Sequence, residues 1–351
     1  MPSINAKLFE KIVTFQVQLK RLDAGTRKKV VTVLEKLQKD LISEVSGQEI
    51  TGLSKSSINA KLKDISTILV DYYSQAEDIL DQDLKGLAKV QTKQAVKSLQ
   101  DTVFVNTDVN IPTETLIDRV VKDNLITGGP ISSWWQRQTD DLKFKLGNAI
   151  RQGVLLNETN QQIITRIVGK GAEPGILPIA RRNAAALVQT AVAGVANDAR
   201  QLVYERNDDI IKSFVWFTAL DSHVCPLCMG RSGKEWKNNK ERTPIGHSIP
   251  FEIPPIHYLD RCLLLPRTLT FEEMGIDLPE TPVGTRASSL GQIDGNTTFD
   301  EYLKMVPQSQ QDEMLGKGRA QLWRDGKITL NQLLSQDGRE LTLRDLEDKY
   351  G

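Results

Sequence analysis

Cysteine and histidine are scarce in this chain of 351 residues, which contains three of each. A secreted disulfide framework uses an even number of cysteines spread along the chain, so these three argue against one. The sequence has no apolar run of about 18 residues and no charged-then-apolar N-terminus, so we expect neither a membrane span nor a signal peptide. These absences favour a chain that folds in a reducing cytoplasm.

Charge bias and catalytic signatures are also absent. Lys plus Arg and Asp plus Glu both total 45, so no global basic character argues for nucleic acid, although a local basic patch is compatible with this balance. The sequence has no nucleophile elbow, no phosphate-cradling Gly-Lys-Ser/Thr loop and no paired carboxylates on a recognisable scaffold. With 39% hydrophobic and 26% charged residues, the composition is that of a soluble globular protein. We expect no enzymatic activity.

Helical periodicity dominates the first part of the chain. Apolar residues recur every three or four positions over residues 8–22 and again over 30–41, and we interpret the intervening 23–26 as a break. Each such row of apolar residues forms one side, or seam, of a helix. A third seam has the same spacing and consists of Ile58, Leu62, Ile65, Leu69, Tyr72, Ala76 and Ile79. These seams predict an antiparallel helical bundle, closed either within the chain or by a partner helix or neighbouring subunit.

The rest of the chain predicts shorter elements. The expected helices are 113–123, 132–152, 160–169 and 179–205. The last of them is rich in alanine, whose small side chain allows close helix packing. β-branched and aromatic residues predict strands at 210–220 and 262–270. The fold class that follows is mainly α, with a small α+β unit.

All the cysteines and histidines lie between His223 and Cys262. Cys225 and Cys228 form a Cys-x2-Cys turn, which can supply one corner of a tetrahedral zinc site. His257 and Cys262 stand at the other end of a polar, glycine-containing loop that could not build a core alone. We therefore predict one structural zinc ion bound by Cys225, Cys228, His257 and Cys262, which would staple this loop.

The segment from His223 to Cys262, here called the Cys/His window, allows other interpretations. The cysteines could simply pack in reduced form, or the Cys-x2-Cys could be a redox element, although its flanks lack the thioredoxin-like context. His247 could replace His257 as a ligand if the loop folds differently. The stretch "GHSIP" at 246–250 is a faint echo of a His-Asn-His nuclease motif, so a zinc-stapled nuclease is the enzymatic alternative.

Three segments of the chain resemble the phage head morphogenesis family, that of the minor head protein of phage Mu and its relatives. They are "AALVQTAVAGVANDARQLVYE", "FVWFTALDSHVCPLCMGRSGKEW" and "PPIHYLDRC". The residues on the family pattern are Asp221, Cys225, Cys228, Gly233, Pro254, Pro255, His257 and Cys262. The family often ends in a compact His-x-x-Cys-Arg-Cys, whereas "HYLDRC" has a single terminal cysteine. Residues 128–169 and 298–346 also resemble flanking parts of these proteins.

Periodicity, composition and this resemblance together divide the chain into four regions. They are a helical region at 1–111, a head-morphogenesis-like domain at 112–270 with its Cys/His zinc unit at 210–270, a linker or arm at 271–296, and a tail of short helices at 297–351.

The family consists of structural capsid proteins, present in few copies, that associate with the portal vertex and act in head assembly or DNA passage. We therefore expect the portal protein and other capsid or scaffold proteins as partners, with non-specific contact to packaged DNA. The expected location is the virion, after assembly in the host cytoplasm. A cellular helical adaptor is the remaining alternative.

Overall fold

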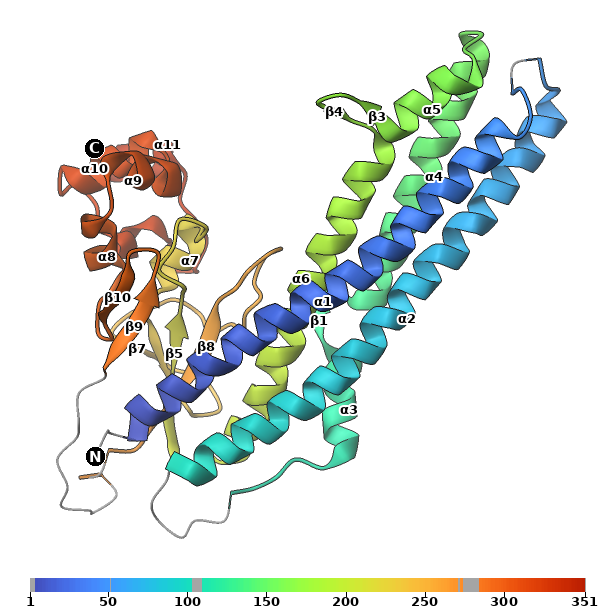
Figure 1. Cartoon of the computed structure of the whole chain (residues 1–351). Coiled ribbons are helices and arrows are strands. Elements are labelled where there is room, and N and C mark those ends of the chain that lie inside the picture. The colour runs from blue at the N-terminus through green and yellow to red at the C-terminus, as the bar shows by residue number, and fades with distance from the viewer. Residues whose placement is uncertain (1–3, 51, 103–108, 271, 274–283, 351) are drawn as a thin grey trace.

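The computed structural model describes residues 4–50, 52–102, 109–270, 272–273 and 284–350 (Figure 1). It is mainly helical with a small sheet part, as predicted. Two long helices and four shorter ones make up one half of the described molecule. The sheet and the C-terminal helices form the other half, and the N-terminal end of the first helix reaches the sheet (Figure 1). None of the helices in these ranges has both the length and the apolarity that a bilayer span requires.

The N-terminal region is an antiparallel pair of long helices, α1 (Ile4–Ser46) and α2 (Lys55–Thr102). Their connection is held by Asn160 of α5 (Asn160–Val168). The Asn160 amide donates to the carbonyls of Val45 and Gln48 at 2.9 Å, and its oxygen accepts from the backbone N–H of Ile50 at 3.0 Å. One side chain thus satisfies backbone groups that the end of α1 leaves free.

The predicted break at residues 23–26 is wrong, because α1 continues through it. Asp23 and Thr26 are buried on the same stripe as the apolar residues before and after them. The Thr26 hydroxyl donates to Asp83 of α2 at 2.7 Å, and Asp23 forms an ion pair with Arg27 at 2.9 Å. The stripe is therefore continuous, and polar partners replace apolar packing at two of its positions.

The α2 seam is closed within the chain. Ile65, Leu69 and Ala76 are buried in a core shared with α1 and α6 (Ile176–Glu205). The other members of the predicted seam are only half-buried, and Tyr73 and Leu80 occupy the buried positions instead of Tyr72 and Ile79. For the buried part of this seam, the structure therefore agrees with a bundle that is closed within the chain and not by a partner.

Three helices and two short hairpins surround this pair. The helices are α3 (Glu114–Asp123), α4 (Ile131–Leu155) and α5, and the hairpins pair β1 (Leu125–Ile126) with β2 (Gly129–Pro130) and β3 (Gly169–Lys170) with β4 (Glu173–Pro174). Thr159 and Gln162 form a capping box at the start of α5. The alanine-rich α6 packs against α1, α2 and α4, so it is the central helix of this half.

The second half is built on a four-stranded antiparallel sheet. Its order is β7 (Pro244–Ile245), β6 (Glu235–Lys237), β5 (Ile211–Phe217) and β8 (Leu263–Thr268). The two predicted strands correspond to β5 and β8, and they are hydrogen-bonded neighbours. Pro266 lies on β8, an edge strand, where a missing N–H is tolerated. The sequence between β5 and β8 contains the whole Cys/His window.

The hairpin of β9 (Thr285–Ser288) and β10 (Gly291–Asp294) lies within the stretch expected to be a linker or arm. Residues 271 and 274–283 of that stretch lie outside the described residues. The tail forms the predicted short helices, namely α8 (Phe299–Met305), α9 (Gln308–Leu315), α10 (Lys317–Arg324), η1 (Leu330–Leu333) and α11 (Leu343–Tyr350). They pack on the sheet in a second core, which also takes in Leu8 and Ile12 of α1.

Candidate metal centre

The Cys-x2-Cys turn begins a short helix, α7 (Pro226–Arg231). Cys225 is its N-cap, and the Cys225 sulfur accepts the backbone N–H of Cys228 at 3.4 Å. Pro226 occupies the first helical position, where the lack of an N–H costs nothing. Both sulfurs point toward the loop before β8, and each lies 3.2 Å from Nε2 of His257.

Cys262 belongs to the same cluster because its sulfur lies near that of Cys228. The ligand atoms of Cys225, Cys228 and His257 all lie within 4.8 Å of one another, and so do those of Cys228, Asp260 and Cys262. The cavity that these residues line has a volume of about 20 Å³, which is room for one ion and not for a substrate. A tetrahedral ion bound at zinc distances places sulfur and nitrogen ligands about 3.6 Å apart. Cys225, Cys228, His257 and Cys262 are therefore positioned to bind a metal ion.

A backbone carbonyl orients His257. Its Nδ1 lies 2.7 Å from the carbonyl oxygen of Tyr258, which can only accept a hydrogen bond. Nδ1 therefore carries a proton, and in the neutral ring Nε2 presents its lone pair to the sulfurs. A second hydrogen bond of this kind is the usual support of a metal-bound histidine.

The pKa values of the four predicted ligands differ, and only that of Cys225 is lowered. A hydrogen bond from Cys228 lowers the pKa of Cys225 to about 4, with help from His257 and against the effect of burial. The hydrogen bond to Cys225 in turn raises the pKa of His257 to about 9. The pKa of Cys228 is raised by its hydrogen bonds to the other two thiols, and burial raises the pKa of Cys262 to about 11. A metal ion must therefore displace protons on binding, so its affinity should increase with pH.

Asp260 is a buried carboxylate that the sequence analysis missed. Its Oδ1 accepts the backbone N–H of Cys262 at 2.8 Å and its Oδ2 that of Ile256 at 2.9 Å. It thereby folds the loop that carries His257 and Cys262, and it also contacts the Cys228 sulfur at 3.7 Å. An aspartate within a polar loop gives no signal of burial, so only its place between two predicted ligands could have pointed to it.

An ion pair joins the two sides of the centre. Arg261 donates through both Nη atoms to Asp221, at 2.9 and 2.7 Å. Burial opposes ionisation of Asp221, but the hydrogen bonds from Arg261 and from the backbone of His223 outweigh it and lower its pKa. Asp221 comes just before the Cys-x2-Cys turn and Arg261 just before Cys262. This bidentate pair therefore holds the ligand-bearing segments together even without a metal.

The ligand loop is also anchored to α6. The Asn197 amide donates to the carbonyls of Pro254 at 2.9 Å and Cys262 at 3.2 Å. The Asn197 oxygen accepts from the buried Arg200 at 2.7 Å, and Arg200 also donates to Gln91 of α2 at 2.9 Å. A buried polar chain thus runs from the long helices to the metal centre.

The other two histidines lie outside this group. His223 has an exposed side chain. Nε2 of His247 lies 2.9 Å from the Glu235 carbonyl, its Nδ1 accepts the N–H of Ile249 at 3.2 Å, and its ring packs on Trp236. Burial, as the largest effect, lowers the pKa of His247. The structure thus brings His257, and not His247, to the cysteines.

Comparison with protein-family models, with curated proteins and with solved structures gave no match to this chain. The class of the site rests on its geometry alone. It is a small group of Cys and His side chains, positioned to bind a metal ion, between a helix start and the edge strand of a sheet in a mainly helical protein.

Proposed function

We propose that this chain is a minor head protein of a phage, a structural component of the capsid at the portal vertex that acts in head assembly and in DNA packaging or ejection. The observation that carries the proposal is the arrangement of the residues that resemble the head morphogenesis pattern. Cys225, Cys228, His257 and Cys262 are separated by up to about forty residues in sequence, yet they surround one small site. Asp221 pairs with Arg261, the neighbour of Cys262.

We propose zinc as the metal, in a structural role. Three thiolates and one imidazole are a ligand set typical of structural zinc. Four protein ligands leave no open position for water or substrate, so the ion would stabilise the fold without chemistry of its own. Residues 246–262 contain neither helix nor strand, and the ion would fix their end to α7.

Electron microscopy of phage particles made with and without this protein tests the proposal. We expect the particles lacking it to have defective heads or to fail in DNA filling, and we expect a labelled copy to lie at a single vertex. Normal, infectious particles without the protein, or label absent from purified particles, would contradict the proposal. A role as a cellular helical adaptor would then fit better, with the protein in host lysate fractions and not in particles.

The nuclease alternative requires a catalytic histidine. His247 is the residue that would have to act, and backbone groups lie within hydrogen-bond distance of both its ring nitrogens. The purified protein should therefore leave double- and single-stranded DNA intact in the presence of Mg²⁺ or Zn²⁺. Reproducible cleavage that His247→Ala abolishes would favour the nuclease.

A further inference from the structure

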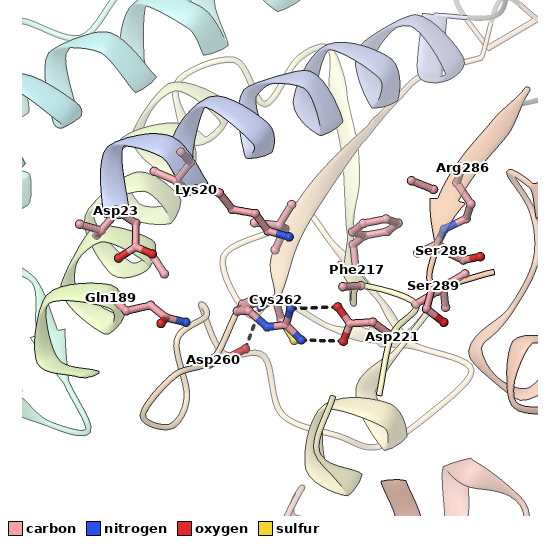
Figure 2. A pocket seen from close by; sticks show the side chains of 18 residues that line it. Lys20, Asp23, Gln189, Phe217, Asp221, Asp260, Cys262, Arg286, Ser288 and Ser289 are labelled. Atoms are coloured by element: carbon pink, nitrogen blue, oxygen red, sulfur yellow. Dashed lines mark hydrogen bonds and ion pairs between the residues drawn. The ribbon is translucent and has the colours of Figure 1, made fainter. Parts of the chain in front are cut away.

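A cavity of about 380 Å³ lies beside the metal centre and has no part in the proposed function. It is enclosed by α1, α6, the end of β5, the loop before β8, and β9 (Figure 2). Its apolar lining includes Leu19, Val192, Ala193, Phe217, Leu220 and Leu263. Its volume and its largely apolar wall are those of a site for a small organic molecule.

The carboxylates that line this cavity already have partners. Asp221 is paired with Arg261 at the centre of Figure 2. Asp260 accepts two backbone N–H groups, and Asp23 is paired with Arg27. Asp221 and Asp260 therefore need no cation from a ligand, whereas Asp23 keeps one buried oxygen, Oδ1, without a hydrogen-bond partner.

Arg286 of β9 lacks such compensation. Its Nη atoms donate to the carbonyls of Thr218 at 2.9 Å and Thr297 at 3.3 Å, and the guanidinium lies over the Phe217 ring at 4.2 Å. Its Nε is buried without a hydrogen-bond partner, and no carboxylate of the described residues forms an ion pair with it. Burial accordingly lowers the pKa of Arg286 to about 10. An arginine charge that is largely withdrawn from water without a counterion is costly, and a bound anion would offset that cost.

Lys20 supplies a second cation from the opposite wall. It lies on α1, and Figure 2 shows its side chain extending toward the middle of the cavity. Within the described ranges it forms no ion pair. The cavity thus combines an apolar wall with two cations that have no carboxylate partner.

We propose that this cavity binds a small amphipathic anion, an apolar carboxylic acid whose body lies on the apolar wall and whose carboxylate faces Arg286 and Lys20. This site is independent of the proposed head function. It shares Asp260, Arg261 and Cys262 with the surroundings of the metal centre, so an occupied cavity and an intact metal centre should stabilise each other.

Binding of decanoate, compared with the neutral decanol, tests the charge. Calorimetry on the full-length, metal-loaded protein should show saturable binding of one decanoate per chain, with decanol at least about tenfold weaker. That factor corresponds to the loss of one charge-assisted hydrogen bond. Decanoate should also raise the melting temperature as its concentration rises. Equal affinity for the two compounds, or no saturable binding of decanoate, would overturn the proposal.

A matched pair of variants tests the place. Lys20→Glu should weaken decanoate binding at least about fivefold, the factor for ~1 kcal/mol from one partly exposed charge pair. Lys28→Glu makes the same charge change on the same helix, at an exposed position that does not line the cavity, and should leave the affinity unchanged. Equal effects of the two variants would place the anion elsewhere.

A filling variant tests the apolar wall. Ala193→Phe should abolish the binding of both compounds while circular dichroism and metal content stay normal. Unchanged binding in a folded Ala193→Phe variant would contradict the proposal. If this variant fails to fold, the comparison of Lys20→Glu with Lys28→Glu decides. Arg286 also borders a second cavity of about 320 Å³, whereas Lys20 and Ala193 line only the first of these two. These two positions therefore distinguish the cavities, which a change of Arg286 alone would not.

Discussion

The two halves of the molecule are stabilised in different ways. The helical half consists of helices of up to 48 residues, whose seams bury Leu, Ile and Ala against one another. The sheet half has strands of two to seven residues, and residues 246–262 within it contain no regular element. Long helices satisfy their own backbone groups, whereas this irregular segment depends on Asp260, Asn197, the Asp221–Arg261 pair and, in our proposal, a metal ion.

Metal removal should therefore affect the halves unequally, and it is the largest effect we expect. Cys228→Ser, or treatment with a strong chelator, should loosen the sheet half, because structural zinc contributes on the order of 10 kcal/mol in small metal-stapled units. Fluorescence of the buried Trp216 and Trp236 should shift to longer wavelength, while far-ultraviolet circular dichroism retains most of the helical signal. His223→Ala, at an exposed histidine outside the ligand group, is the control and should change neither signal. A Cys228→Ser protein with unchanged tryptophan emission would mean that the metal is dispensable.

Leu69→Asp should have the complementary effect on the helical half. Leu69 is fully buried, so an unpaired carboxylate there costs several kcal/mol or forces protonation. We expect loss of most of the helical signal at neutral pH, measured by circular dichroism during urea unfolding. Val70→Asp on the same helix is the control, because Val70 is 44% exposed and should tolerate the change. A folded Leu69→Asp protein would show that the seam is not closed as the structure has it.

The interface alternative for this seam can be tested with the same variant. If a head component covered the seam, Leu69→Asp would fold normally and fail to enter particles. Thermal stability and particle incorporation, measured together, separate these outcomes.

The contrast between the halves also explains how much could be predicted. Apolar spacing was enough to predict helix within parts of α1 and α2, and the Cys/His spacing indicated the side chains that are positioned to bind a metal ion. Both signals are local or confined to a few residue types. The break expected at Asp23 and Thr26 was wrong because pattern reading treats a buried polar residue as a loop. Thr26 donates to Asp83 of another helix, and sequence spacing does not record such a pair. Asp23 pairs with Arg27 one turn further along the same helix.

The same reason accounts for what was missed around the metal. Asp260 accepts from backbone N–H groups of the ligand loop and Asn197 donates to its carbonyls. Every residue type offers these backbone groups, so the sequence does not indicate which of them are used. Arg261 pairs with an aspartate on the far side of the Cys/His window. These contacts depend on the fold as a whole and are visible only in three dimensions.

The contact between the halves should be sensitive to one added methyl group. A Cβ on Gly194 of α6 would lie 2.8 Å from Nδ2 of Asn124 and 3.2 Å from Cδ of Pro255 in the ligand loop. Gly194→Ala should therefore lower the free energy of unfolding by about 1–3 kcal/mol, as overpacking does. Gly86→Ala on α2 is the control, since a Cβ there meets nothing within 4 Å, and it should stabilise by about 0.5–1 kcal/mol through helix propensity. Urea unfolding of both variants measures the difference, and equal effects would refute the close contact.

An effect of similar size concerns a carboxylate at the same contact. Burial, its largest cause, raises the pKa of Asp198 to about 6, against a hydrogen bond from Asn124 at 2.7 Å. A raised pKa in the folded state means that this group costs stability above pH 6, and that the cost disappears as the pH falls to about 4. Asp198→Asn should stabilise the protein at pH 7 by up to about 3 kcal/mol and give no gain at pH 4.

A second reason favours the same change. Oδ1 of Asn124 is buried without a hydrogen-bond partner. The new amide can donate to it at every pH, whereas the Asp198 carboxyl can do so only while it is protonated, so this gain too disappears at pH 4. Unfolding free energies of both proteins across pH 4–7 give the test. A gain from Asp198→Asn that is the same at both ends of this range would show that ionisation of Asp198 is not the cause.

The central claim is that one metal ion joins the Cys-x2-Cys turn to the loop before β8. X-ray absorption at the zinc edge, with metal analysis of protein purified without chelator, measures this most directly. The account predicts about one zinc per chain, with three sulfur ligands near ~2.3 Å and one nitrogen near ~2.0 Å. Protein that is folded and free of metal, or zinc surrounded only by oxygen and nitrogen, would contradict it.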